Sequence, residues 1–220
     1  MTAAELITNH IPSLHSTDTV QFALNIMQDN QVAELPLLDN NQKYIGLIHE
    51  EDMEDADKNT TVETYLQTGK PVQVNPGDFF LVPLKIMQQR KLSLLPVVNE
   101  EGELTGVITR EELLQAASQY NSASVPGGVI ILQMSPNSFY ISEIGRIVES
   151  NNARIIHLNT WTDASTGELM VAIKVNKTDI LDILASFERY QYNVLRYFGE
   201  NLSEDELKVN YDHLMNYLNI

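Results

Sequence analysis

The sequence predicts a mixed α+β / α/β protein with two β-α-β-β-α repeats, a βαββαβ domain and a C-terminal helix. Three observations predict this architecture. The first 118 residues contain an internal duplication, the next segment alternates strand and helix patterns, and the last twenty residues carry an amphipathic helical pattern. A chain of 220 residues has room for one large domain or two small ones.

The duplication is visible when the chain is shifted against itself by 60 positions, which aligns residues 6–53 with residues 66–113 without a gap. Random pairing would give roughly three identities. The identical pairs are Leu6/Leu66, Thr8/Thr68, Asp18/Asp78, Leu24/Leu84, Ile26/Ile86, Met27/Met87, Gln28/Gln88, Leu35/Leu95, Pro36/Pro96, Gly46/Gly106, Ile48/Ile108 and Glu51/Glu111. We therefore place one repeat at residues 1–58 and the second at residues 59–118.

Each repeat shows the same order of patterns. A short extended piece, at 11–14 and at 71–74, precedes a turn and a helix with an Asp near its start, where the helix dipole favours a carboxylate. Apolar residues at helical spacing predict one buried face on that helix. Two apolar runs joined by a polar turn then predict a hairpin, at 35–48 and at 95–108. A final helix is expected to start near Glu50 or Arg110.

The hairpin motifs carry a family resemblance. Leu95-Pro-Val-Val-Asn and Gly106-Val-Ile-Thr-Arg-Glu-Glu112 resemble the cystathionine-β-synthase (CBS) repeat, with its Leu-Pro-Val-Val-Asp and Gly-Ile-Ile-Thr-x-x-Asp patterns. The resemblance covers residues 1–118 and implies that the two repeats pack through their sheets into a Bateman module. It also implies clefts that bind an adenine nucleotide or S-adenosylmethionine as a regulatory ligand, with no obligatory cofactor.

The resemblance further implies a set of ligand contacts. In the family the Thr-x-x-Asp pair holds the ribose hydroxyls, because a carboxylate accepts strong hydrogen bonds from two vicinal hydroxyls. The second repeat has Thr109 with Glu112 at these positions, and the first has His49 with Asp52. Phosphate needs cations, and the second repeat has a cluster of them in Lys85, Arg90, Lys91 and Arg110. Arg110 and Lys91 are the candidate phosphate contacts, and valines form apolar walls. The expected contacts are Val72, Val74, Leu95, Pro96, Thr109, Arg110, Glu112, Lys91, His49 and Asp52.

Departures from the family pattern keep two functions open. Neither repeat keeps both Thr and Asp. Family members often have small residues just before Leu-Pro, which leave room for adenine, whereas here Leu94 fills that space and Glu34 brings a charge. One interpretation is a non-catalytic regulatory protein that senses an adenosyl ligand such as AMP, ADP or ATP. The alternative is a dimerising scaffold or protein-interaction module with degenerate ligand sites. His49 is either a proton-sensitive contact or an exposed residue at the end of a hairpin.

A second region follows a polar, turn-prone linker at 119–127. Its pattern is βαββαβ, which is typical of a ferredoxin-like fold. Residues 128–200 resemble an ACT domain, a small regulatory fold that commonly binds amino acids at dimer interfaces. The first turn here, Ser135-Pro-Asn-Ser, lacks the usual Gly. Nearly the whole chain is similar to the acetoin-utilisation-type CBS–ACT proteins of bacteria.

Residues 201–220 are predicted to form the amphipathic C-terminal helix. Ser203 and Glu206 make a capping box, and Leu207, Leu214 and Leu218 recur at helical spacing. This apolar seam packs either on the chain's own sheet or against a partner subunit. Because both sheet domains also leave open edges, a homodimer is expected, and a regulated protein partner is possible.

The composition argues against several classes of function. There are 14 Lys and Arg residues against 30 Asp and Glu, and a net charge of −16 disfavours binding to nucleic acid or to an anionic membrane. The chain has no Cys, and its five His residues lack metal-ligand spacing, so no metal site is expected. No P-loop, nucleophile elbow or dinucleotide motif indicates an enzyme. Without a leader or a membrane-spanning apolar run, we expect a cytoplasmic protein.

Overall fold

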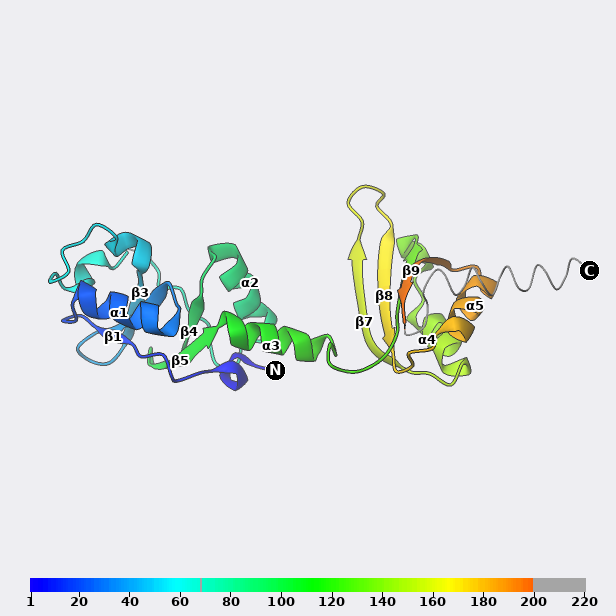
Figure 1. The fold of residues 1–220 in the computed structure, drawn as a ribbon, viewed down its shortest axis with the longest axis horizontal. Coiled ribbons are helices and arrows are strands. Elements are labelled where there is room, and N and C mark those ends of the chain that lie inside the picture. The colour runs from blue at the N-terminus through cyan, green and yellow to red at the C-terminus, as the bar shows by residue number, and fades with distance from the viewer. Residues whose placement is uncertain (68, 200–220) are drawn as a thin grey trace, which may run out of the picture. The chain divides into compact units, whose positions relative to one another are not determined.

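The computed structural model describes residues 1–67 and 69–199, which divide into two compact units with the boundary between Gln119 and Tyr120 (Figure 1). Each unit has its own hydrophobic core. The predicted α+β class is confirmed, and most of the predicted strands and helices are observed. The helix predicted at 201–220 lies outside the described residues.

In the first repeat, helix α1 (Val20–Asn30) packs against a small sheet of order β1-β2-β3. The Thr19 side chain accepts a hydrogen bond from Phe22 N (3.3 Å) and starts the helix, and Gln31 ends it in the left-handed conformation. Strand β1 runs parallel to β2, which pairs antiparallel with β3. The other elements are η1 (Ala3–Leu6), β1 (Leu14–His15), β2 (Glu34–Leu38), β3 (Tyr44–His49) and η2 (Glu50–Met53).

The second repeat follows the same plan with two differences. Its extended piece makes only a single bridge, between Val74 and Val97, and its last element is an eleven-residue helix, α3. The helix expected near Glu50 in the first repeat is only the 3₁₀ turn η2. Acidic side chains crowd that segment and repel one another, and Met53 is its one buried residue. The elements are η3 (Val62–Tyr65), α2 (Leu81–Arg90), β4 (Leu94–Val98), β5 (Leu104–Thr109) and α3 (Arg110–Tyr120).

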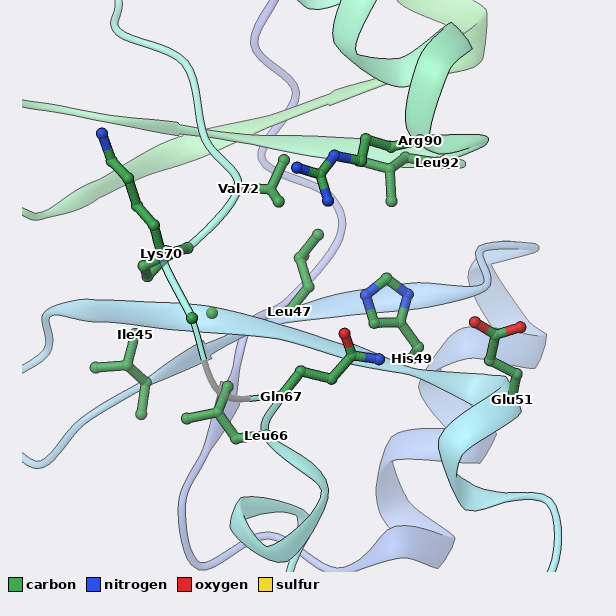
Figure 2. Close-up of a pocket in the computed structure, with 13 residues that line it drawn as sticks. Ile45, Leu47, His49, Glu51, Leu66, Gln67, Lys70, Val72, Arg90 and Leu92 are labelled. Carbon is green, nitrogen blue, oxygen red and sulfur yellow. The ribbon is translucent and has the colours of Figure 1, made fainter.

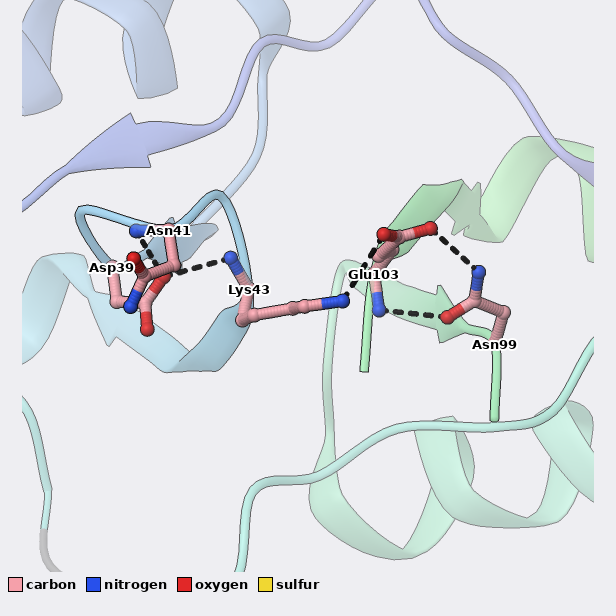
Figure 3. Close-up of polar contacts among 5 residues, drawn as sticks. All are labelled: Asp39, Asn41, Lys43, Asn99 and Glu103. Carbon is pink, nitrogen blue, oxygen red and sulfur yellow. Dashed lines mark hydrogen bonds and ion pairs between the residues drawn. The ribbon is translucent and has the colours of Figure 1, made fainter. Parts of the chain in front are cut away.

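The two repeats face each other across a pseudo-two-fold axis, because residues 60 positions apart meet there. Figure 3 shows one such pair at the hairpin tips, where Lys43 Nζ lies 3.0 Å from Glu103 Oε1. Each tip is ordered in the same way, since Asp39 Oδ1 accepts a hydrogen bond from Lys43 N and Asn99 Oδ1 accepts one from Glu103 N (2.8 Å each). The duplicated sequence therefore folds as one pseudo-symmetric body.

A shared core holds this body together. The central strands β2 and β4 contribute buried side chains to the same cluster, including Leu35, Leu37, Leu94 and Leu95. All four are fully buried. The Leu-Pro motifs that identify the duplication thus lie at the centre of the fold.

The second unit is a four-stranded antiparallel sheet of order β7-β8-β6-β9, with helices α4 and α5 on one face (Figure 1). Its core includes Ile130, Ile147, Ile173 and Phe187, each at most 1% exposed. The predicted ferredoxin-like order is observed. The elements are β6 (Val129–Met134), η4 (Pro136–Ser138), α4 (Ile141–Ser150), β7 (Ile155–Thr162), β8 (Leu169–Val175), α5 (Leu181–Arg189) and β9 (Asn193–Phe198).

The substitution Leu95→Ala is expected to lower the free energy of unfolding by about 2–5 kcal/mol, because it leaves a cavity at a fully buried position. Urea denaturation of the purified chain measures this loss. The matched control is Leu114→Ala in α3, whose side chain is 72% exposed, and its effect is expected to stay within about 0.5 kcal/mol. Equal effects of the two substitutions would contradict the assignment of Leu95 to the core.

Candidate ligand cleft

A cavity of about 470 Å³ opens beside strand β3, and we call it the β3 cleft (Figure 2). Its size is in the range of small-molecule and cofactor sites. The first repeat contributes β3 and Glu51, and the second contributes the chain before Val74 and the end of α2. The lining residues are Ile45, Gly46, Leu47, His49, Glu51, Leu66, Gln67, Gly69, Lys70, Pro71, Val72, Arg90 and Leu92.

The apolar walls come from β3 and from the segment that crosses it. Gly46 lets Leu66 approach closely, because an added Cβ at Gly46 would collide with the Leu66 side chain. Val72 is held in place by Tyr44, whose hydroxyl donates a hydrogen bond to the Val72 carbonyl (2.8 Å). Burial raises the pKa of the Tyr44 phenol, so the hydroxyl remains a donor.

Polar groups gather at the end of β3. Figure 2 shows the Arg90 side chain on the opposite side of the cleft from the His49 ring, with the Gln67 amide near the ring. The Gln67 amide donates a hydrogen bond to Asp52 Oδ2 (2.9 Å), so Asp52 supports a residue of the lining. Lys70 and Arg90 are the basic residues of this lining, and Glu51 is its acidic residue. The cleft thus combines apolar walls with groups that bind an anion and hydroxyls.

The structure brings together only part of the contact set expected from the sequence. Val72 and His49 line the cleft, and Asp52 reaches it through Gln67. Val74, Leu95 and Pro96 are instead buried, with Val74 N donating to the Pro96 carbonyl (3.0 Å), and they are not part of the lining.

Thr109 and Glu112 form a capping box at the start of α3. Glu112 Oε2 accepts hydrogen bonds from Thr109 N (3.1 Å) and from the Thr109 hydroxyl. Thr109 Oγ1 in turn accepts from Glu111 N (3.2 Å). In the fold Thr109 is the counterpart of His49, since each ends its hairpin. The pair therefore lies at the pseudo-symmetric counterpart of the β3 cleft, where its polar groups are engaged with each other.

The two proposed phosphate contacts are also outside the lining of the β3 cleft. Lys91 takes the left-handed conformation that ends α2 (φ 58°), and its side chain is exposed. Arg110 donates from Nε to the Leu92 carbonyl (2.8 Å) and from Nη2 to the Lys91 carbonyl (2.9 Å). It lines a separate apolar groove between α2 and α3.

The sequence analysis did not assign Lys70 or the amide of Gln67 to the cleft, and it named Arg90 only as one of the clustered cations of the second repeat. A signal was present, because residues 67–71 directly precede Val72, which was expected to form a wall. Glu34, which was expected to bring charge where adenine would lie, is 2% exposed and is not in the lining. Its carboxylate contacts Ser93 and Leu94 of the second repeat.

Within residues 1–67 and 69–199, His, Asp and Glu side chains form no group of three or more that is placed to hold a metal ion. No helix in the same ranges has the length and apolar character needed to cross a membrane.

Comparison with known proteins gives two matches to a family model. The model described as "CBS domain" matches residues 3–59 and 62–119. Among solved structures, a CBS domain pair/ACT domain protein from Thermotoga maritima is 24% identical with a TM-score of 0.50. The match covers 54% of this chain and 98% of that chain. At this identity the likeness shows the fold alone.

Similar curated proteins include two archaeal enzymes. Homoserine O-acetyltransferase of Methanobrevibacter ruminantium is 29% identical over 117 residues, and inosine-5'-monophosphate dehydrogenase of Methanocaldococcus jannaschii is 26% identical over 113 residues. These matches cover 53% and 51% of this chain but only 24% and 23% of the relatives. The chain thus matches about a quarter of each enzyme's length, and the enzyme names describe those proteins.

The substitution Thr109→Ala is expected to lower the free energy of unfolding by about 1 kcal/mol, because it removes the side-chain oxygen that caps α3. Thr109→Ser keeps that oxygen and is expected to keep most of the stability. Chemical denaturation of both variants measures the difference. An unchanged stability of Thr109→Ala would show that the capping box does not stabilise α3.

Proposed function

The chain belongs to the CBS-domain family, and we propose that its CBS pair is a regulatory unit that binds an adenosyl ligand in the β3 cleft. CBS pairs generally bind such ligands in a regulatory role. The observation that carries the proposal is the lining of the cleft, where apolar walls lie next to Lys70, Arg90 and His49. An adenosyl phosphate presents the matching set of a flat ring, hydroxyls and an anion.

Each part of the ligand has a proposed contact. Val72 and Leu47 face the adenine as apolar walls, and Arg90 and Lys70 neutralise the phosphate. The ribose hydroxyls bond to the polar end of β3, with His49 and Gln67 in the lining and Asp52 behind Gln67. This assignment keeps the ribose role expected for the first repeat.

The position that is pseudo-symmetric to the β3 cleft is a second proposed place for a ligand. Thr109 and Glu112 are the ribose contacts there, and binding requires that the capping box opens. For Arg110 the observed contacts argue against a phosphate role, because two backbone carbonyls already accept hydrogen bonds from its guanidinium. Lys91 keeps an exposed side chain and remains a proposed phosphate contact.

The proposed regulatory role rests on the fact that both repeats contribute walls to the β3 cleft. A ligand shifts a conformational equilibrium only by the difference in its affinity for the two states. Because both repeats contribute to the lining, a bound ligand responds to any change in their spacing. We propose that the protein is non-catalytic and cytoplasmic, and that the ACT-like second unit supports a homodimer and transmits the bound state to a regulated protein partner.

A dimerising scaffold is the second candidate function. The sheet edges of the second unit favour it, because among the described residues β7 and β9 each pair with a strand on only one side. Trp161 on β7 and Phe198 on β9 are 43% and 57% exposed. This candidate needs no ligand, so ligand binding separates the two.

Thermal unfolding in the presence of AMP, ADP, ATP, S-adenosylmethionine and NAD tests the proposal. A ligand present at about 100 times its dissociation constant adds roughly 2.7 kcal/mol of stability, which raises the melting temperature by several degrees. The protein must first be stripped of bound nucleotide, verified by its absorbance at about 260 nm. If none of these compounds raises the melting temperature, the scaffold function replaces the sensing function.

The substitution Arg90→Gln is expected to weaken AMP binding by roughly tenfold, because a charge-assisted hydrogen bond to phosphate is lost. Adenosine binding is expected to change by less than about twofold, since adenosine has no phosphate. Titration calorimetry with both ligands measures the two affinities. The control is Arg146→Gln in α4, which removes the same charge from the second unit. Equal losses for AMP and adenosine would contradict a phosphate contact at Arg90.

A further inference from the structure

The connection between α2 and β4 lies between two cavities. Leu92 lines both the β3 cleft and the apolar groove that contains Arg110. Arg90, which precedes this connection, lines the β3 cleft but not the groove. We call residues 91–94 the α2–β4 connection. A displacement of this connection moves Leu92 and Arg90, and with them one wall of the β3 cleft.

Arg110 holds the connection from the side of α3. Its Nε and Nη2 groups donate to the carbonyls of Leu92 (2.8 Å) and Lys91 (2.9 Å), and its backbone N–H donates to the Ser93 carbonyl (3.1 Å). One residue therefore satisfies three consecutive carbonyls. A planar guanidinium is suited to this because its N–H groups point in fixed directions.

Glu34 holds the connection from the first repeat. Its Oε1 accepts hydrogen bonds from Ser93 N (2.5 Å), Ser93 Oγ (2.9 Å) and Leu94 N (2.7 Å). Ser93 Oγ also accepts from Ala33 N (2.9 Å). With 2% of its surface exposed, Glu34 is shielded from water, so these donors replace the solvation of its carboxylate.

The first repeat supplies an internal comparison. Its equivalent connection, residues 31–34, also begins with a left-handed residue and also receives a backbone hydrogen bond, from Glu50 N to the Ala33 carbonyl (2.8 Å). However, Glu50 stands where the second repeat has Arg110, and Leu94 stands where the first has Glu34. The 31–34 connection thus forms without counterparts of the side-chain hydrogen bonds that Arg110 and Glu34 make to residues 91–94. The added contacts occur on the connection that lines the β3 cleft.

We propose that Arg110 and Glu34 are positioning residues of the β3 cleft, which hold the α2–β4 connection from both sides and thereby place Arg90 and Leu92 against the ligand. The proposal rests on the proposed function of the cleft. Arg110 acts through backbone carbonyls and does not touch the phosphate. Its loss therefore affects the binding of the whole ligand, whereas the loss of Arg90 affects only the phosphate.

Titration calorimetry of the full chain with adenosine and with AMP, well below the melting temperature, tests this inference. Arg110→Lys keeps the charge, but one ammonium cannot replace the forked pair of hydrogen bonds. We expect it to weaken both ligands by the same factor, roughly tenfold. Glu34→Gln keeps the size of the side chain and is expected to show the same pattern. The control Lys85→Gln removes an exposed cation of α2 and should change either affinity by less than about twofold.

The outcomes separate the roles. If Arg110→Lys binds AMP as tightly as the original chain while Arg110→Gln loses only AMP affinity, Arg110 is a phosphate contact and the inference is overturned. Unchanged affinities in the variants of both Arg110 and Glu34 also overturn it. If Arg110 and Glu34 only stabilise the fold, their substitution lowers the melting temperature but leaves the ligand affinities of the folded chain unchanged.

Hydrogen–deuterium exchange without ligand gives a second readout. Arg110→Lys and Glu34→Gln are expected to speed the exchange of the amides of residues 92–94 at least fivefold, with the rest of β4 unchanged. If the original chain binds neither adenosine nor AMP, the proposed function fails, and exchange alone decides whether the two residues hold the connection. Unchanged exchange in both variants would overturn the positioning role whatever the ligand result.

Discussion

The pairing of the two repeats across their pseudo-two-fold axis is the constraint on which the first unit depends. A single repeat offers a sheet of two or three strands, which is too small to bury its apolar face by itself. Pairing places Leu35 and Leu95 in one hydrophobic core. The same pairing creates the β3 cleft, since a strand of one repeat meets the connecting segments of the other. Stability and the candidate site therefore have a common origin.

The sequence predicted the features that depend on local pattern. Both hairpins, the helix of each repeat and the βαββαβ order follow from apolar periodicity and turn residues, and the structure has them. The end of the first repeat differed because helical propensity there competes with repulsion between like charges at i,i+4 spacing, Glu50 with Glu54 and Glu51 with Asp55. The run of acidic residues in the sequence does not by itself show whether helical propensity or this repulsion dominates.

The site was predicted only in part, for a different reason. Val72, His49 and Asp52 could be assigned because each occupies a position in a motif. Lys70 could not be assigned, and Arg90 was indicated only as one of several clustered cations, since their place in the lining depends on how a turn and a crossing segment direct their side chains. Arg110 resembled a phosphate contact by its charge, yet its partners are backbone carbonyls, which carry no sequence signal. Glu34 was interpreted as an unwelcome charge at the adenine position because its hydrogen-bond donors lie some sixty positions away in the sequence.

Pseudo-symmetry also has a consequence for assembly. A residue on the axis always faces the residue that occupies its own position in the other repeat, and here the two differ: Lys43 faces Glu103, and Ala33 faces Ser93. Suppose that two first repeats from different chains paired instead. Lysine would then face lysine, and two Glu34 carboxylates would be buried together without the hydroxyl of Ser93. Because the two repeats differ at these positions, the first repeat pairs better with the second repeat than with another first repeat. This difference disfavours the pairing of identical repeats from two chains.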